Sequence, residues 1–199
     1  LESALTQMCA VGVEAVTIDD IVGAVSMAKG NFYRYFDSKE ALVEVAFDPL
    51  RTALVDASSR CAASLRRARS RRALSGLYMA LAFEVATAVA AHPLALTLYL
   101  QEARGPDRGA RAPICALARD VERAAIELAE LAAASGLVRD RDSRFVALIV
   151  VGAAEKLLCA QRTSSEPFDA ALAAQTLIEV VLDGVRAPAR RRRPSAPAG

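Results

Sequence analysis

The chain has 199 residues, of which 54% are hydrophobic and 5% aromatic, and its formal net charge is +2. Long stretches rich in Ala, Leu, Val, Arg and Glu are typical of an almost entirely helical protein, and this length can bury a core as one or two domains. No secretory signal opens the sequence, and Glu155 and Lys156 interrupt the best candidate for a membrane span. We therefore expect a cytoplasmic protein outside any membrane.

The first predicted elements are two short helices. Residues 2–11 form a helix with one apolar side, and Gly12 is placed to end it. Thr17 precedes the next apolar run, so its hydroxyl can accept from the free amide of Asp20, whose carboxylate favours the positive end of a helix. This pattern predicts a second helix over residues 18–24.

A corner of three residues, 25–27, follows the second helix. It is too short for the chain to reverse, so the helix predicted over residues 28–35 leaves at a steep angle, as in a helix-turn-helix. A helix of this width fits the DNA major groove, where Lys donates to guanine, Asn pairs with adenine and Tyr donates to phosphate. A glycine among these residues lets the backbone approach DNA closely. The residues are Lys29, Gly30, Asn31 and Tyr33.

The dipeptide Asp37-Ser38 ends this helix and caps the next one. It places Lys39 beside free backbone amides at a helix N-terminus, which is a ready site for a phosphate. We therefore interpret residues 17–44 as a DNA-reading head.

The run from Thr17 to Leu42 resembles the DNA-binding head of the TetR family of one-component repressors. The family pattern is roughly T-x-x-D-I-A-x-x-A-G-V-S-K-G-T-L-Y-x-Y-F-x-S-K-E-x-L, and about a dozen positions agree at fixed spacing without a gap. The matching residues are Thr17, Asp20, Ile21, Lys29, Gly30, Tyr33, Tyr35, Phe36, Ser38, Lys39, Glu40 and Leu42.

The resemblance implies an all-α fold with two domains. Residues 1–47 would be a three-helix helix-turn-helix DNA-binding domain, and residues 48–186 a helical ligand-binding and dimerisation domain. It also implies that Thr17 and Lys39 hold phosphates, that Tyr35 contacts the DNA backbone and that the reading helix faces base edges. The expected DNA contacts are Thr17, Ala28, Lys29, Gly30, Asn31, Tyr33, Tyr35 and Lys39.

Three residues depart from the family pattern. Ser26 stands where a turn glycine is usual, so a residue with a side chain must accept the backbone of the corner. Ala28 replaces a serine, which removes a hydroxyl from the phosphate contacts and weakens the helix cap. Asn31 replaces a threonine or serine, and we expect it to alter base preference. These changes bear on the operator sequence rather than on the motif.

The charge of the head suggests an alternative function. Residues 1–47 contain three basic and seven acidic side chains, a net charge of −4. A DNA-binding domain usually carries a basic patch. The alternative hypothesis is therefore a helical ligand-binding or sequestering protein that has lost sequence-specific DNA binding. We also expect that an N-terminal arm, which often precedes this point in the family, lies outside the numbered sequence.

The rest of the chain reads as further helices. Asp48-Pro49 predicts either a kink or a fresh helix start, and an apolar stripe then continues to about Arg69. The arginine-rich run 66–72 reads as a solvated turn. The strongly apolar segment 73–91 predicts a central buried helix. It is followed by a shorter helix over residues 94–104 and a Gly/Pro loop.

The last three predicted helices have broad apolar stripes. They cover about 113–134, a segment from Asp142 or Ser143 to about Gln161, and a segment from Glu166-Pro167 to Arg186. The last two read as half of a homodimer's four-helix bundle, through residues 142–161 and 166–186, with completion of the monomer core as the alternative. The tail, 187–199, is Pro/Ala-rich with four consecutive arginines, which predicts disorder, with non-specific DNA contact as a second possibility.

A regulator of this kind needs a binding site for an effector. The middle helices, 73–134, are more apolar than is needed to hold two DNA-binding heads apart. We expect a cavity between them that binds an unknown small apolar effector. In the absence of the effector, a dimer would bind a palindromic operator in double-stranded DNA with its two reading helices roughly 34 to 36 Å apart. Binding of the effector would release the dimer from this operator. Each polar candidate in this region could instead be a surface or helix-pairing residue. The candidates are Tyr78, Glu84, Tyr99, Gln101 and Arg104.

No sequence feature indicates an enzyme, a cofactor or a metal site. The GxSxG, P-loop, HExxH and dinucleotide motifs are all missing, and the one histidine, His92, has no nucleophile near it in sequence. The four cysteines are scattered singly without a CxxC pair, so we expect reduced thiols, with a redox sensor as the alternative. They are Cys9, Cys61, Cys115 and Cys159.

Overall fold

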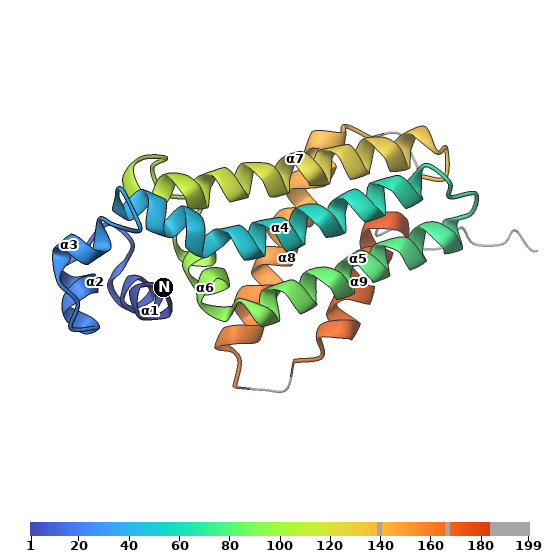
Figure 1. Cartoon of the computed structure of the whole chain (residues 1–199). Helices are drawn as coiled ribbons and strands as arrows, with labels where there is room; N and C mark the ends of the chain where they lie inside the picture. Colours follow the sequence, from blue (N-terminus) through green and yellow to red (C-terminus); the bar gives the residue numbers. More distant parts are fainter. Residues whose placement is uncertain (139–140, 166–167, 184–199) are drawn as a thin grey trace, which may run out of the picture.

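The computed structural model describes residues 1–138, 141–165 and 168–183. Within these residues every regular element is helical, and three short helices form a head at one end of an elongated body (Figure 1). The head contains α1 (Glu2–Val11), α2 (Ile18–Ala24) and α3 (Lys29–Phe32). The body contains α4 (Lys39–Leu65), α5 (Arg71–Ala91), α6 (Pro93–Glu102), the 3-10 turn η1 (Gly109–Arg111), α7 (Ala112–Ala134), α8 (Ser143–Thr163) and α9 (Ala170–Asp183).

The predicted cap of α2 is present. The Asp20 backbone N–H donates to Thr17 Oγ1 at 3.1 Å, and the Thr17 N–H donates to Asp20 Oδ2 at 2.8 Å. This capping box satisfies free backbone N–H groups at the start of α2 and so stabilises a helix of only seven residues. The following corner holds Ser26 at φ 51°, in the left-handed region that the usual glycine adopts without steric cost.

The reading helix α3 is shorter than the predicted 28–35. It covers Lys29–Phe32, and its N-cap residue Ala28 makes no side-chain hydrogen bond. The next residues continue as turns, because the N–H groups of Arg34 and Tyr35 bond to the carbonyls three residues back instead of four. Phe32 is only 1% exposed and anchors this segment to the core of the head.

The body differs from the prediction at Pro49. Helix α4 runs from Lys39 to Leu65 with Pro49 inside it, so a fresh helix start at that position is wrong. Proline removes one backbone donor, but its fixed φ is helical, and the flanking Phe47 and Leu50 are buried and hold the helix in place. The helix crosses the predicted domain boundary between residues 47 and 48.

The helix α5 is not the central buried helix that the sequence predicts. Three of its residues, Leu74, Ala88 and Val89, are buried, and Phe83 is 75% exposed. The centre is instead formed by α4 and α7, which pack along each other, while α5 covers α4 from one side and α8 covers α7 (Figure 1). The apolar inner face of α5 borders a cavity rather than a packed core.

Several helix ends also differ from the predicted ones. Helix α4 ends at Leu65, before the arginine-rich run, and α5 starts at Arg71 because the Ser70 hydroxyl accepts from the N–H of Ala73 at 3.2 Å. Helix α9 begins at Ala170 rather than at 166–167. Its first turn is capped by Asp169, whose Oδ1 accepts from the N–H of Leu172 at 2.9 Å. Residues 166–167, 184–186 and the predicted disordered tail, 187–199, lie outside the described residues.

Among the described residues, α5 is the helix whose length and apolar composition would suffice to cross a membrane. It packs against α4 and α9 in this fold. Its one acidic residue, Glu84, accepts a hydrogen bond from Arg60 of α4 at 3.0 Å. These contacts make α5 a wall of the helical body.

Candidate nucleic-acid interface and cavity

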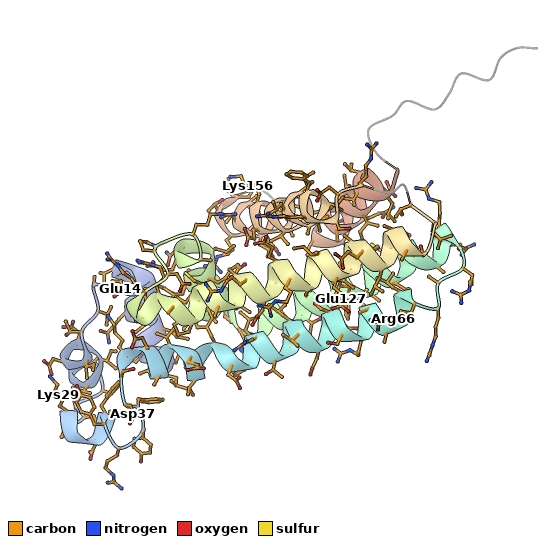
Figure 2. All side chains as sticks on the ribbon, turned by 90° about the horizontal axis from the view of Figure 1, so that it is seen from above. Glu14, Lys29, Asp37, Arg66, Glu127 and Lys156 are labelled. Atoms are coloured by element: carbon orange, nitrogen blue, oxygen red, sulfur yellow. The ribbon has the colours of Figure 1, made fainter. Side chains whose placement is uncertain are left out.

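The polar face of α3 points away from the protein. Lys29, Asn31 and Tyr33 are exposed, Tyr33 by 49%, while Phe32 between them is buried. The Tyr33 ring stands edge-on to Phe32 with centroids 5.5 Å apart, so the buried ring orients the exposed one. The helix therefore presents polar side chains from a fixed apolar base, at the end of the molecule marked by Lys29 and Asp37 (Figure 2).

The ammonium of Lys29 is paired with α2. It lies 2.8 Å from Asp19 Oδ1, and this hydrogen-bonded carboxylate raises the pKa of Lys29. Both side chains are more than half exposed, so the pair adds little stability and can be exchanged for a phosphate contact. Asp19, one of the seven acidic residues in residues 1–47, thus compensates the charge of one of the three basic residues there.

Gly30 has open space around it. A Cβ built on this residue would meet no atom within 4 Å, so the packing of the protein does not require glycine there. Ala28 and Tyr35 are also exposed, with Tyr35 in the turn that follows α3. Arg34, in the same turn, is an exposed cation that is not among the predicted DNA contacts. Its position is variable in the family pattern, so no motif pointed to it.

Thr17 and Lys39, the two predicted phosphate contacts, already have partners inside the head. The Thr17 hydroxyl donates to Asp20 Oδ2 at 2.7 Å, and this bond together with the Thr17 N–H lowers the pKa of Asp20. The half-buried Lys39 Nζ donates to the carbonyls of Val16 at 2.8 Å and Glu14 at 3.1 Å. An ammonium has three protons, so Lys39 braces the loop between α1 and α2 and keeps one proton for another acceptor.

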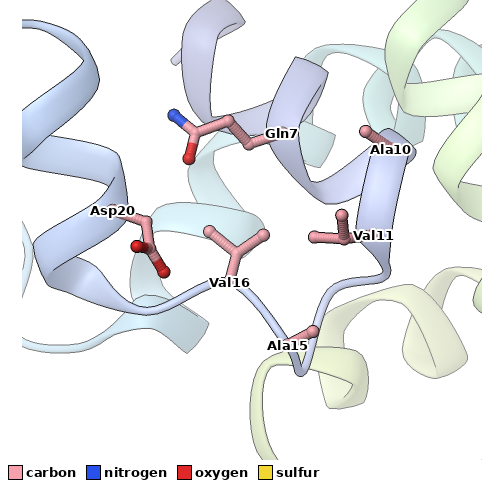
Figure 3. Close-up of a pocket in the computed structure, with 6 residues that line it drawn as sticks. All are labelled: Gln7, Ala10, Val11, Ala15, Val16 and Asp20. Carbon is pink, nitrogen blue, oxygen red and sulfur yellow. The ribbon is translucent and has the colours of Figure 1, made fainter.

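A small hollow of about 220 Å³ lies between α1 and the start of α2 (Figure 3). The Gln7 amide and the Asp20 carboxylate lie on one side of it, and Val11 and Val16 on the other. The amide nitrogen of Gln7 is buried without a hydrogen-bond partner in the described part of the chain. The hollow is too small for a drug-sized ligand.

A much larger cavity, of about 1170 Å³, lies in the body between α4, α5, α7, α8 and α9. Its walls are mainly Ala, Val and Leu side chains, and two tyrosines of the predicted ligand set line it. The Tyr78 hydroxyl donates to the Leu128 carbonyl at 3.3 Å, and the Tyr99 hydroxyl donates to Glu155 Oε1 at 2.7 Å. Burial raises the pKa of Tyr78 to about 12 and also raises the pKa of Tyr99, so both hydroxyls are neutral donors at physiological pH.

The other three predicted ligand contacts do not line the cavity. Glu84 faces Arg60 across the α4–α5 contact, and Gln101 Nε2 donates to the Cys9 carbonyl at 3.2 Å. Arg104 lies at an exposed position just after α6 and pairs with Glu155 Oε2. These three residues lie outside the cavity wall because a helix surface carries polar side chains toward partner helices as well as toward a cavity.

Two partly buried carboxylates in the cavity wall were not predicted from the sequence. Asp120 of α7 is 14% exposed and lies 2.6 Å from Arg51 of α4, and Glu155 of α8 is 15% exposed. Both sit among apolar residues in the cavity-facing stripes of their helices, which was the one available signal.

Residues 1–46 match the family model described as bacterial regulatory proteins, tetR family. The N-terminal domain belongs to the TetR family. The resemblance seen in the sequence is thus confirmed, and so is the all-α fold class with a TetR helix-turn-helix domain followed by a helical domain. No curated protein matches the chain by sequence.

Solved structures of transcriptional regulators are similar in fold over most of the chain. PfmR from Thermus thermophilus is 19% identical, with 94% of this chain and 98% of that chain covered at a TM-score of 0.66. FadR from Bacillus subtilis, in complex with stearoyl-CoA, is 13% identical, with coverages of 93% and 97% and a TM-score of 0.69. KstR2 of Mycobacterium tuberculosis, a ketosteroid transcriptional regulator, is 23% identical, with coverages of 92% and 91% and a TM-score of 0.65.

Proposed function

We propose that this TetR-family protein is a ligand-responsive DNA-binding transcriptional regulator, acting as a repressor that a small apolar molecule releases from a palindromic operator. The observation that carries the proposal is the exposed polar face of α3, with Lys29, Asn31 and Tyr33 standing on the buried Phe32. A short helix with this face is suited to the major groove, where the three side chain types can contact base edges and phosphates. Because the partner is DNA, the proposed place of action is the cytoplasm.

The outer faces of α8 and α9 support a homodimer. Phe145 and Ile149 are each 64% exposed on α8, and Leu172 is 59% exposed on α9. Exposed apolar side chains on two neighbouring helices favour pairing with the same two helices of a second copy, which buries them in a four-helix bundle. A two-fold dimer would place its two α3 helices roughly 34 to 36 Å apart on a palindrome.

The body cavity is the proposed effector site. Its volume of about 1170 Å³ exceeds that of a typical small-molecule pocket, and its walls are mainly apolar. The similar folds of FadR, solved with stearoyl-CoA, and of the ketosteroid regulator KstR2 support an effector with a large apolar part. Such a molecule would release DNA by favouring a dimer whose reading helices are out of register with the two half-sites.

The function is tested by selecting DNA from a random pool with the purified protein and measuring retention of the enriched fragment in a gel shift. We expect retention of a palindrome at low and moderate salt in excess scrambled competitor DNA. Loss of binding when salt is added, or no enrichment at all, would instead favour the ligand-sequestering alternative. The net charge of −4 in the head supports that alternative.

A further inference from the structure

The turn between α4 and α5 concentrates positive charge. Residues 66–72 contain five arginines and no acidic residue, and all five arginines are exposed. In the sequence, residues 184–199, which follow α9, add five further arginines and no acidic residue. Like charges at this density repel one another, and a bound polyanion relieves the repulsion. Four of the exposed arginines, which we call the distal arginine patch, are Arg66, Arg67, Arg69 and Arg72.

The backbone that carries the patch is held in place by the body. Ala68, in the middle of the turn, is 7% exposed, and Leu65 and Leu74 on either side of it are buried in one apolar cluster with residues of α7. Arg71, between the patch residues, donates to the carbonyl of Leu182 in α9. The turn is therefore fixed to three helices, so that little backbone entropy is lost when its arginines bind a partner.

Acidic side chains compensate little of the charge of the patch. Arg66 pairs with Glu127 of α7 at 3.4 Å, but both side chains are more than half exposed, so the pair is weak. Arg69 Nη1 donates to two backbone carbonyls of the same turn, at 3.2 and 2.9 Å, and these neutral groups leave its charge uncompensated. Among the described residues, no carboxylate forms an ion pair with Arg67 or Arg72.

The patch and the reading helix α3 lie at opposite ends of the molecule. Helix α4 begins beside the head and ends at Leu65, directly before the patch, and its 27 residues span about 40 Å. Figure 2 shows the same separation between Arg66 on the body and Lys29 on the head. A segment of DNA read by α3 is thus about 40 Å from the patch. Any partner of the patch is therefore bound separately from that segment.

The surface around the patch indicates the class of partner. The nearest exposed large hydrophobic side chains in the sequence are Val55 and Phe83, both well outside the turn. A protein partner needs apolar anchors at the centre of its interface, and a small anion needs a concave site. The phosphate backbone of a DNA duplex needs neither of these features. Exposed arginines bind it, because the planar guanidinium matches phosphate by paired hydrogen bonds.

We propose that the distal arginine patch binds the phosphate backbone of duplex DNA without reading its sequence, on a segment other than the one that α3 reads. A dimer with two heads and two patches then holds two segments of DNA together. Because the patch is separate from α3, this binding adds to the proposed function and does not depend on it.

The test measures binding of a non-operator duplex to the full-length protein by fluorescence anisotropy across a salt series. Every protein compared carries Lys29→Ala and Tyr33→Ala, which remove contacts of the head, so that binding reports on the body. The patch variant adds Arg67→Gln/Arg69→Gln/Arg72→Gln. The matched control removes three exposed arginines elsewhere on the body, and with them the same net charge, by Arg108→Gln/Arg119→Gln/Arg123→Gln.

We expect the protein with an intact patch to bind the duplex at low salt. The patch variant should bind at least about tenfold more weakly, and the slope of its log affinity against log salt should be smaller by about 2 to 3, because each phosphate contact contributes about 0.9 to the slope. The matched control should keep the affinity and the slope. Thermal unfolding of both variants checks that the helical body is intact.

A capture experiment tests the second segment directly. Protein with an unaltered head is bound to the selected operator on beads, and a labelled non-operator duplex is added. The patch substitutions should leave retention on the operator unchanged and reduce capture of the second duplex by about tenfold. If no operator can be selected, the proposed function is wrong, and the anisotropy measurement still decides whether the patch binds DNA.

Three results would overturn the inference. The first is an intact patch that does not bind the duplex at low salt, and the second is equal binding by the patch variant and the matched control. The third is displacement of the duplex by polyglutamate as effectively as by unlabelled DNA at the same concentration of charge, which would assign the patch to an acidic protein instead.

Discussion

The carboxylate of Glu102, the last residue of α6, accepts a hydrogen bond at 3.0 Å from the backbone N–H of Val13 in the head. Glu102 is buried, and its second oxygen accepts from Arg111 Nε at 2.7 Å. One helical turn before Glu102, Tyr99 lines the body cavity. A single helix thus contacts the cavity with one turn and the head with the next, and it links the proposed effector site to the DNA-reading end.

Removing the Glu102 side chain should destabilise the protein. Glu102→Ala leaves the fully buried N–H of Val13 without an acceptor and Arg111 without its carboxylate, at a cost of about 3 kcal/mol in the free energy of unfolding. Glu102→Gln keeps an acceptor for Val13 and should cost less. Urea denaturation measures both values.

The matched control for this bond is Gln101→Ala. Gln101 also bonds to the head, through the Cys9 carbonyl, but it is exposed, and its loss should change stability by no more than about 0.5 kcal/mol. Equal effects of the two alanine variants would show that the Glu102 bond does not hold the head to the body.

Truncating the exposed face of α3 should weaken binding to the selected operator without affecting dimerisation. Tyr33→Ala and Lys29→Ala should each cost about 1 to 3 kcal/mol of binding free energy, and Lys29→Ala should also reduce the salt dependence by about one ion. Lys39→Ala is less suitable as a probe, because Lys39 also braces the carbonyls of Glu14 and Val16. Fluorescence anisotropy across a salt series measures both quantities.

Tyr33→Phe separates the hydroxyl of Tyr33 from its ring, and Arg119→Ala on the body serves as the charge control. If the parent protein and the Tyr33→Ala and Lys29→Ala variants retained the operator equally, α3 would not be the reading helix.

The parts of the head that the sequence predicted depend on short-range chemistry. The capping box joins Thr17 to Asp20, three residues apart, so the pattern alone defined the start of α2. The backbone of Ser26 was predictable in the same way, because the family pattern places a glycine at that corner. Lys29 and Tyr33 were expected to face DNA from their residue types and from the family pattern, and both are exposed.

The features that the sequence did not predict depend on partners far away in the chain. Pro49 stays within α4 because neighbouring side chains are buried against other helices. Asp120 is held by Arg51, and a separation of this kind leaves no trace in local periodicity. The apolar character of α5 was visible, but it could not distinguish a helix in a packed core from one that borders a cavity, as the exposed Phe83 shows.

Placing a charge on the outer face of α8 should separate the proposed dimer. Ile149 is 64% exposed, so Ile149→Glu should leave the monomer folded while burying an unpaired carboxylate in the dimer interface. Sedimentation equilibrium should show a monomer, and operator binding should fall with the loss of the second half-site. Phe83→Glu changes a residue of α5 that is even more exposed and should remain dimeric. Dissociation of Phe83→Glu, but not of Ile149→Glu, would move the interface to α5.

Cys61 and Tyr78, two uncharged hydrogen-bond donors in the body, should make the free energy of unfolding depend on pH in the alkaline range. Burial raises the pKa of Cys61 from 9.0 to about 11 and that of Tyr78 from 10.0 to about 12. In the folded state Cys61 Sγ contacts the Leu77 carbonyl at 4.0 Å and Tyr78 donates to Leu128, so ionisation removes a donor from each contact. The unfolded chain therefore loses these protons at lower pH than the folded protein does.

Because both folded pKa values are raised, the stability that these groups contribute is fully present below about pH 9 and is lost as pH rises through about 11 for Cys61 and about 12 for Tyr78. Urea denaturation at a series of pH values should show a free energy of unfolding that is independent of these groups below pH 9 and then declines, by about 2 kcal/mol for Cys61 alone. Cys61→Ala should reduce this decline, as should Tyr78→Phe, whereas Cys159→Ala on α8 should not. An undiminished alkaline decline in the Cys61→Ala/Tyr78→Phe double variant would assign the effect to other groups.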